Sequence, residues 1–91
     1  MNNMRAHVIV AGRVQGVCFR SWSENRLNSI GVTGWIKNLS DGSVEAVVEG
    51  AGDKVQLAIK ALQSGPSLAE VETVQVDYES PTGEFSRFSI R

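Results

Sequence analysis

The sequence has little of the residues that most often build metal sites or cross-links. It contains one cysteine, Cys18, and one histidine, His7, among 91 residues. A single cysteine cannot form an internal disulfide, and these two side chains do not make a zinc ligand set. We therefore expect no metal and no other cofactor. The unpaired thiol favours a reducing compartment, so the cytoplasm is the expected location.

An excess of positive charge and long apolar runs are also absent. Nine Lys and Arg residues are balanced by ten Asp and Glu, which gives a formal net charge of −1. Such a chain has no general positive field to attract nucleic acid or an anionic membrane surface. No stretch approaches the roughly 18 apolar residues of a membrane span, and the first residues do not follow the order of a secretion signal. We expect neither nucleic acid nor membrane as a partner.

What the sequence does contain is a regular succession of strand and helix patterns. Its length fits one core but not two, so we expect a single domain over residues 1–91. A three-turn helix is expected between Gly16 and Gly31, with Trp22 and Ser23 at its shoulder, and a second from Asp53, as N-cap with Gln56 in capping-box position, to Gly65-Pro66. Strands are expected at residues 5–14, 32–38, 43–50, 69–79 and 85–91.

The order of these elements indicates the fold class. The sequence reads as βαββαβ followed by a short final strand, and Asp41-Gly42 is the turn signal of a hairpin between the second and third strands. The simplest arrangement is an antiparallel or mixed sheet with both helices on one face. We therefore predict an α+β fold of the ferredoxin-like sandwich type.

One stretch, "GRVQGVCFR" at residues 12–20, has the composition of an anion-binding loop. Successive backbone N–H groups in a glycine-containing turn that opens onto a helix N-terminus form a concavity suited to phosphate. Arg20 lies in the first helical turn, where the helix dipole is also positive, and it adds a planar, permanently charged fork. The expected phosphate-binding residues are Gln15, Gly16, Val17, Cys18, Phe19 and Arg20.

This stretch and a second one, "GWIKNLSDGSVE", together resemble the paired signature of acylphosphatases, which are small hydrolases of carboxylic–phosphoric mixed anhydrides. The resemblance implies that Arg20 and Asn38 are the catalytic pair and that the substrate is a small acyl phosphate. We also expect a monomer, and inorganic phosphate as a competitive inhibitor because it can occupy the same loop. Two residues depart from the family pattern: Leu27 stands where a small residue is common, and Cys18 stands where glycine is frequent.

The chemistry of an acyl phosphate explains why the loop has no candidate nucleophile. The leaving group is a carboxylate whose conjugate acid has a pKa of roughly 4 to 5, so no general acid is needed. A loose phosphoryl-transfer transition state asks for positioning and charge stabilisation more than for a base. Asn38 can accept a hydrogen bond from a water and orient it in line with the leaving oxygen. The sequence does not identify the physiological acyl group.

Simpler interpretations exist for each of these residues. An arginine after a turn is most often a solvated surface residue, and Asn38 alone would be a strand-end turn former. Cys18 lies too close to Arg20 to act as the thiolate of a cysteine phosphatase, and we expect it to be a small packing residue. His7 is expected to be structural or exposed, and the two tryptophans are expected to pack.

Three other functions remain as alternatives. An RNA-binding α+β module needs aromatic residues on a basic sheet, whereas these strands carry Glu45, Glu49, Glu72 and Asp77. A regulatory domain that binds phosphate without turnover would not need Asn38. A module of a larger carbamoyl-transfer enzyme would be expected to have a linker, and none follows Arg91.

Overall fold

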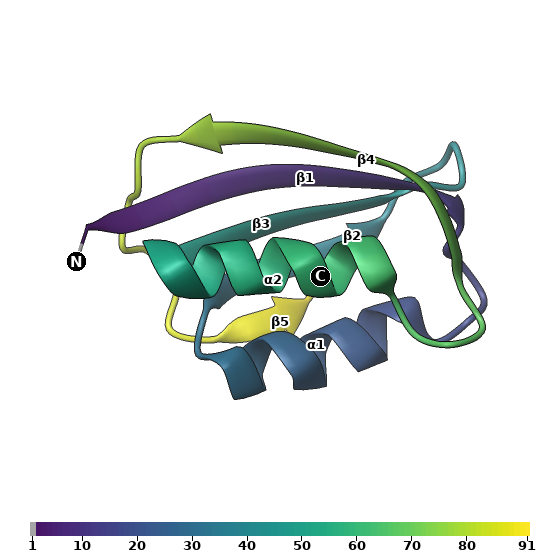
Figure 1. Cartoon of the computed structure of the whole chain (residues 1–91), viewed down its shortest axis with the longest axis horizontal. Helices are drawn as coiled ribbons and strands as arrows, with labels where there is room; N and C mark the ends of the chain where they lie inside the picture. Colours follow the sequence, from purple (N-terminus) through teal and green to yellow (C-terminus); the bar gives the residue numbers. More distant parts are fainter. Residues whose placement is uncertain (1) are drawn as a thin grey trace.

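The computed structural model describes residues 2–91, and within them two helices and five strands follow the predicted order (Figure 1). The described elements are β1 (Asn3–Arg13), α1 (Phe19–Ile30), β2 (Thr33–Asn38), β3 (Val44–Ala51), α2 (Gly52–Ser64), β4 (Glu70–Glu79) and β5 (Phe88–Ile90).

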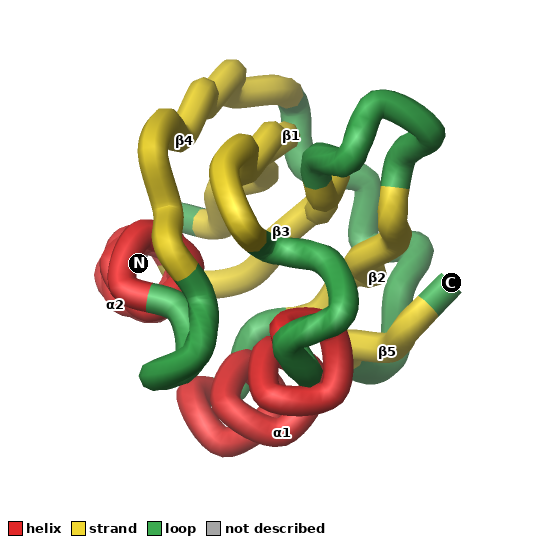
Figure 2. Tube along the Cα trace, turned by 90° about the vertical axis from the view of Figure 1, so that its right-hand side faces the viewer, coloured by secondary structure: helices red, strands yellow, loops and turns green. Residues whose placement is uncertain are grey.

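The strands form one mixed sheet in the order β4-β1-β3-β2-β5. β1 pairs antiparallel with β3 and β4, β2 and β3 form the expected hairpin, and β5 runs parallel to β2. Both helices cover the same face of the sheet, as Figure 2 shows. The predicted ferredoxin-like α+β sandwich is confirmed.

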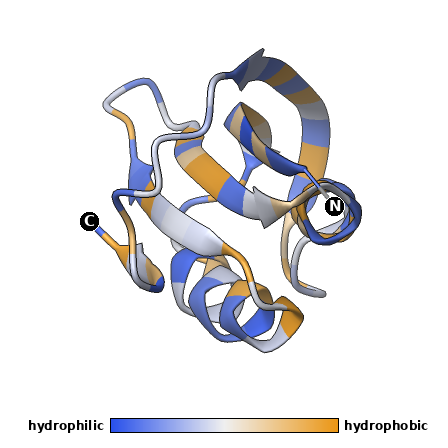
Figure 3. Cartoon of the chain, turned by 90° about the vertical axis from the view of Figure 1, so that its left-hand side faces the viewer, coloured by the Kyte–Doolittle hydropathy of each residue, from blue (hydrophilic) through white to orange (hydrophobic). Residues whose placement is uncertain are grey.

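The core lies between this face and the two helices. Inward-facing and outward-facing residues alternate along β1 and over most of β4, and orange and blue bands follow one another along strands of the sheet in Figure 3. Helix α1 contributes Phe19, Ser23 and Leu27 at four-residue intervals, and these side chains are buried. The core also includes Ala6, Val8 and Val10 of β1, Ile36 of β2, Val44, Ala46 and Val48 of β3, Val55, Ala58, Ile59 and Leu62 of α2, Phe88 of β5, and Val14, Val17 and Val32 of the connecting loops.

Three local predictions were wrong. The N-cap of α2 is Ala51 and not Asp53, and Gln56 donates to the Tyr78 hydroxyl at 3.1 Å rather than completing a capping box. The helix begins earlier because the Gly52 N–H finds a backbone acceptor, the Asn2 carbonyl, at 3.2 Å. Ser23 is fully buried rather than at the shoulder of α1.

The final strand is also shorter than predicted, because residues 85–87 approach β2 without continuous pairing and only Phe88–Ile90 form a ladder with it. Phe88 packs in the core while Ile90, at the end of the sheet, stays partly exposed. This difference matters for the site, since the end of β5 lies next to the end of β2 that carries Asn38.

Candidate active site

A cavity of about 220 Å³ opens where the β1–α1 loop, the first turn of α1 and the ends of β2 and β5 meet. It brings Arg20 and Asn38 together, although they lie on different elements. Val17, which was predicted to line the phosphate site, does not line the cavity, because its side chain is buried in the core. The lining residues are Val14, Gln15, Gly16, Cys18, Phe19, Arg20, Ser21, Asn38 and Ile90.

The loop backbone has two residues in the left-handed region, a feature of anion-binding concavities. Gly16 and Cys18 both have positive φ, 74° and 62°, while Val17 between them does not. Alternation of left-handed and right-handed residues turns successive N–H groups toward one point. Helix α1 begins directly afterwards at Phe19, so its free N-terminal N–H groups face the same region.

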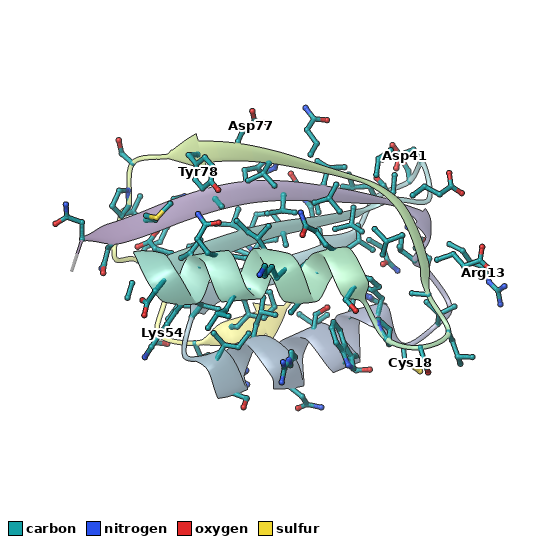
Figure 4. The ribbon with its side chains drawn as sticks, viewed as in Figure 1. Arg13, Cys18, Asp41, Lys54, Asp77 and Tyr78 are labelled. Carbon is teal, nitrogen blue, oxygen red and sulfur yellow. The ribbon has the colours of Figure 1, made fainter. Side chains whose placement is uncertain are left out.

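Cys18 is exposed, and its prediction as a packing residue was wrong. It caps α1 in the left-handed conformation, which turns its side chain out of the loop toward solvent (Figure 4). A non-glycine residue in this conformation costs about 1 kcal/mol or more. Glycine would avoid this cost at the position.

Arg20, in the first turn of α1, is available to a ligand. Within residues 2–91 its guanidinium makes no ion pair and no hydrogen bond, and the first turn of α1 contains no acidic residue. The nearest carboxylate on the same helix is Glu24, one turn further on. Glu24 is engaged elsewhere: its Oε2 accepts from the Ile90 N–H at 3.3 Å and lies 3.8 Å from Arg87.

Asn38 is exposed at the last position of β2, where its backbone is paired with Val44 of β3. Close contact between β2 and β3 depends on Gly34, because a Cβ there would lie 1.8 Å from the Val47 carbonyl oxygen and φ is 134°. The hairpin beyond Asn38 is closed by Asp41, whose Oδ1 accepts from both the hydroxyl and the N–H of Ser43, at 2.5 and 2.9 Å. These bonds, the hydroxyl first, lower the pKa of Asp41.

Gln15 connects the loop to this hairpin. Its side-chain Nε2 donates to the Leu39 carbonyl at 2.8 Å and to the Ser43 carbonyl at 2.9 Å. Both N–H groups of the side-chain amide therefore already donate to protein carbonyls. Of Gln15, only the backbone is left for the predicted binding of phosphate by residues 15–20, which we call the phosphate cradle.

Sequence reasoning missed three of the lining residues: Val14, Ser21 and Ile90. Ser21 had a local signal, because a serine three residues after a helix cap can bond back to it, as its Oγ does to the Cys18 carbonyl at 3.2 Å. Ile90 had none, since its place depends on the parallel pairing of β5 with β2.

Other groups that could support different functions lie away from the cavity. His7 is half-buried on the open face of the sheet, with its Nε2 2.6 Å from Glu45, and this hydrogen bond is the main cause of the lowered pKa of Glu45. Among the described residues, no three His, Cys, Asp or Glu side chains gather as a metal site. No helix in the described part of the chain is long and apolar enough to cross a membrane.

The fold is that of a small α+β protein whose cavity is lined by an arginine, an asparagine and a glycine-containing loop, and comparison with known proteins gives its family. A family model described as Acylphosphatase matches residues 6–90. A protein named acylphosphatase from Roseiflexus sp. is 52% identical over 90 residues, covering 99% of this chain and 97% of that one. The chain belongs to the acylphosphatase family, and the resemblance noted in the sequence is confirmed.

Solved structures of acylphosphatases have the same fold as this chain. The crystal structure of an acylphosphatase from Bacillus subtilis has a TM-score of 0.92 at 33% identity, over 97% of this chain and 98% of that one. An acylphosphatase from Coxiella burnetii has a TM-score of 0.92 at 37% identity, over 99% of this chain and 94% of that one. The protein is accordingly a hydrolase, and its substrate is a small-molecule acyl phosphate.

Proposed function

We propose that this acylphosphatase cleaves the carboxyl–phosphate bond by in-line attack of one oriented water, with no metal and no covalent intermediate. The observation that supports this mechanism is the shared cavity, in which an unpaired arginine and a strand-end asparagine lie beside a glycine-containing loop at a helix N-terminus. The family fixes the reaction, and these residues supply a way to carry it out.

The loop and Arg20 hold the phosphoryl group. Backbone N–H groups of residues 15–19 and the N-terminal end of α1 donate to its oxygens, and the Arg20 guanidinium adds two charged donors. Charge spread over the equatorial oxygens in the transition state meets donors that are already in place, so little reorganisation is needed during the reaction. This group comprises Gln15, Gly16, Val17, Cys18, Phe19 and Arg20.

Asn38 orients the water. Its side-chain oxygen accepts a hydrogen bond from the water, whose oxygen forms the new bond to phosphorus while the bond from phosphorus to the acyl oxygen breaks. The acyl group leaves as a carboxylate, which needs no protonation because its conjugate acid has a pKa of roughly 4 to 5. The proton from the water passes to a phosphate oxygen, and inorganic phosphate is the second product.

Several finer properties belong to the same proposal. We propose a monomer in which residues 1–91 act as one domain, with inorganic phosphate as a competitive inhibitor because it fits the same cradle. Nucleic acid is not expected as a ligand, since the strands carry exposed acidic residues such as Glu72 and Asp77. The exposed Cys18 thiol suits a reducing compartment, and we propose the cytoplasm.

The test compares Arg20→Gln and Asn38→Ala in hydrolysis of a small aromatic acyl phosphate and in calorimetric titration with inorganic phosphate. Losing a charged hydrogen-bonding group costs about 1.5 to 3 kcal/mol, so Arg20→Gln should lose roughly 10- to 150-fold in phosphate affinity and lose turnover as well. Asn38→Ala should keep phosphate affinity while turnover collapses, because an unoriented water loses its positional advantage.

Arg13→Gln is the matched control. It removes the same charge close to the same loop, but Arg13 does not line the cavity and only approaches Glu70, at 3.8 Å. Its effect should be small in both assays. Loss of phosphate binding in Asn38→Ala as severe as in Arg20→Gln would contradict the separate roles assigned to the two residues.

A further inference from the structure

We propose that the Gln15 side chain is a positioning residue that fixes Asn38 relative to the phosphate cradle. The inference rests on the proposed mechanism, in which Asn38 orients the attacking water. It gives Gln15 two separate roles. The Gln15 backbone belongs to the cradle, while the Gln15 side chain holds the β2–β3 hairpin that carries Asn38.

The hydrogen bonds of Gln15 bracket the position of Asn38. Leu39, whose carbonyl accepts one of them at 2.8 Å, is the next residue along the chain. Ser43, whose carbonyl accepts the other at 2.9 Å, precedes Val44, the residue paired with Asn38 across the hairpin. The two N–H groups of one amide thus hold both strands of the hairpin at the point where Asn38 projects.

The Leu39 and Ser43 carbonyl oxygens each accept two hydrogen bonds, and one of the two comes from Gln15. The Leu39 carbonyl also accepts from the Gly42 N–H at 3.3 Å, and the Ser43 carbonyl from the Leu39 N–H at 2.9 Å. The Gln15 amide takes the second lone pair of each oxygen. In the described chain no other hydrogen bond joins residues 12–20 to residues 38–44.

The sheet does not join the cradle to Asn38 directly. The cradle follows β1 and Asn38 ends β2, but β1 and β2 are not neighbours, because β3 lies between them. The cradle and Asn38 therefore lie on two segments that leave the sheet separately, although α1 packs on β2 and β5. A misplacement of about 1 Å between reacting groups can cost on the order of a hundredfold in rate, so the contact between the loops should affect the chemical step.

The test is a double-mutant cycle on kcat between Gln15→Met and Asn38→Ala. Methionine keeps the length of glutamine and removes both donors. We expect Gln15→Met to lower kcat roughly tenfold, as loss of two neutral hydrogen bonds and of positioning implies. Affinity for inorganic phosphate should change by less than about twofold, because the backbone donors and Arg20 remain. In the Asn38→Ala background Gln15→Met should lower kcat no further, because the group it positions is gone.

Asn28→Leu is the matched control. Asn28 also makes two side-chain to backbone bonds, 2.8 Å to the Phe88 carbonyl and 2.9 Å from the Phe88 N–H, but these tie α1 to β5. Whatever factor Asn28→Leu imposes on kcat in the parent should recur in the Asn38→Ala background. Thermal unfolding of every variant establishes that each is folded at the assay temperature, and Gln15→Ala replaces Gln15→Met if the latter is not.

The outcomes separate this inference from the mechanism on which it rests. If Asn38→Ala retains the parent kcat, the proposed mechanism fails and the positioning role fails with it. If Asn38→Ala loses turnover but Gln15→Met lowers kcat by the same factor in both backgrounds, the mechanism stands and the positioning role is refuted. A loss of phosphate affinity in Gln15→Met as large as in Arg20→Gln would show that Gln15 serves the cradle instead.

Discussion

The carboxylate of Glu49, on the open face of the sheet, should stabilise the fold more than any exposed ion pair around it. Its side chain is only 4% exposed. It accepts from the Gly83 N–H at 2.6 Å, from the Thr82 N–H at 3.2 Å and from Arg5 at 3.2 Å. These bonds hold the segment between β4 and β5 against β1 and β3 on the open face of the sheet.

Glu49→Gln is the perturbation that tests this role with little change of shape. The amide can accept only through its oxygen, and its NH₂ group must face one of the N–H donors. Hydrogen bonds to a charged group are worth about 1.5 to 3 kcal/mol, and breaking a buried pair about 3 to 5 kcal/mol. We expect the free energy of unfolding to fall by about 2 to 4 kcal/mol.

Glu79→Gln is the control for this substitution. Glu79 bonds the same arginine, Arg5, at 2.9 Å, but its side chain is 46% exposed. Solvent-exposed pairs contribute about 0 to 1 kcal/mol, so the control should lose much less. A loss in Glu49→Gln no larger than that in Glu79→Gln would refute the reasoning.

The pH dependence gives a second check. Burial raises the pKa of Glu49, but the Gly83 and Thr82 N–H groups and Arg5 lower it by more, so the pKa lies below its ordinary value of 4.5. A carboxylate with a lowered folded-state pKa contributes stability that is complete above the unfolded-state pKa and is lost as the pH falls through the folded-state value. The gap between parent and Glu49→Gln should therefore be constant from pH 7 to about pH 5 and shrink below pH 4.

Urea unfolding followed by tryptophan fluorescence and far-UV circular dichroism, at several pH values, measures both effects. Trp22 and Trp35 lie on α1 and β2, so the fluorescence reports on both layers. A gap that stays unchanged down to pH 3 would mean that the ionised carboxylate is not the source of the stability.

The remaining predictions concern Ser23, Cys18 and metal ions. Ser23→Ala should raise the free energy of unfolding by roughly 1 kcal/mol in urea titrations, because the Ser23 hydroxyl is buried without a partner among the described residues and alanine favours helix; a destabilised variant would reveal a hidden partner. Cys18→Ala should keep turnover, since the mechanism uses no thiolate; an inactive but folded variant would contradict it. Hydrolysis should survive exhaustive chelation, and a lost rate restored by magnesium or zinc would indicate a different mechanism.

The fold was predictable where the patterns are local. Period-two alternation located the strands, helical spacing located both helices, and Asp41-Gly42 marked the hairpin. The errors came from distant contacts: the start of α2 depends on the Asn2 carbonyl, which no capping pattern near Asp53 can reveal. Likewise the length of β5 depends on how residues 85–87 approach β2.

The site residues likewise divide into those that a local sequence pattern predicts and those that it does not. The cradle is a continuous stretch ending in Arg20, so its chemistry could be inferred from the residues themselves. Asn38 was assigned through the family resemblance, since an asparagine at a strand end has a simpler explanation as a turn former. The side-chain bonds of Gln15 and the place of Ile90 follow from the strand order, and no pattern within either segment indicates them.

When the leaving group departs as a stable carboxylate, the protein needs no general acid or base. Catalysis then depends mainly on how the reacting groups are positioned. Two side chains and a loop backbone can then be enough for catalysis, and a protein with a single small core can hold them in place. In the proposed mechanism, nearly all the rate comes from the positions in which Arg20 and Asn38 are held. Helix α1 mounts the first and the β2–β3 hairpin mounts the second, each through many local hydrogen bonds. Gln15 makes the side-chain hydrogen bonds between the loop before α1 and this hairpin, so substitutions at Gln15 should reduce turnover more than their cost in stability would suggest.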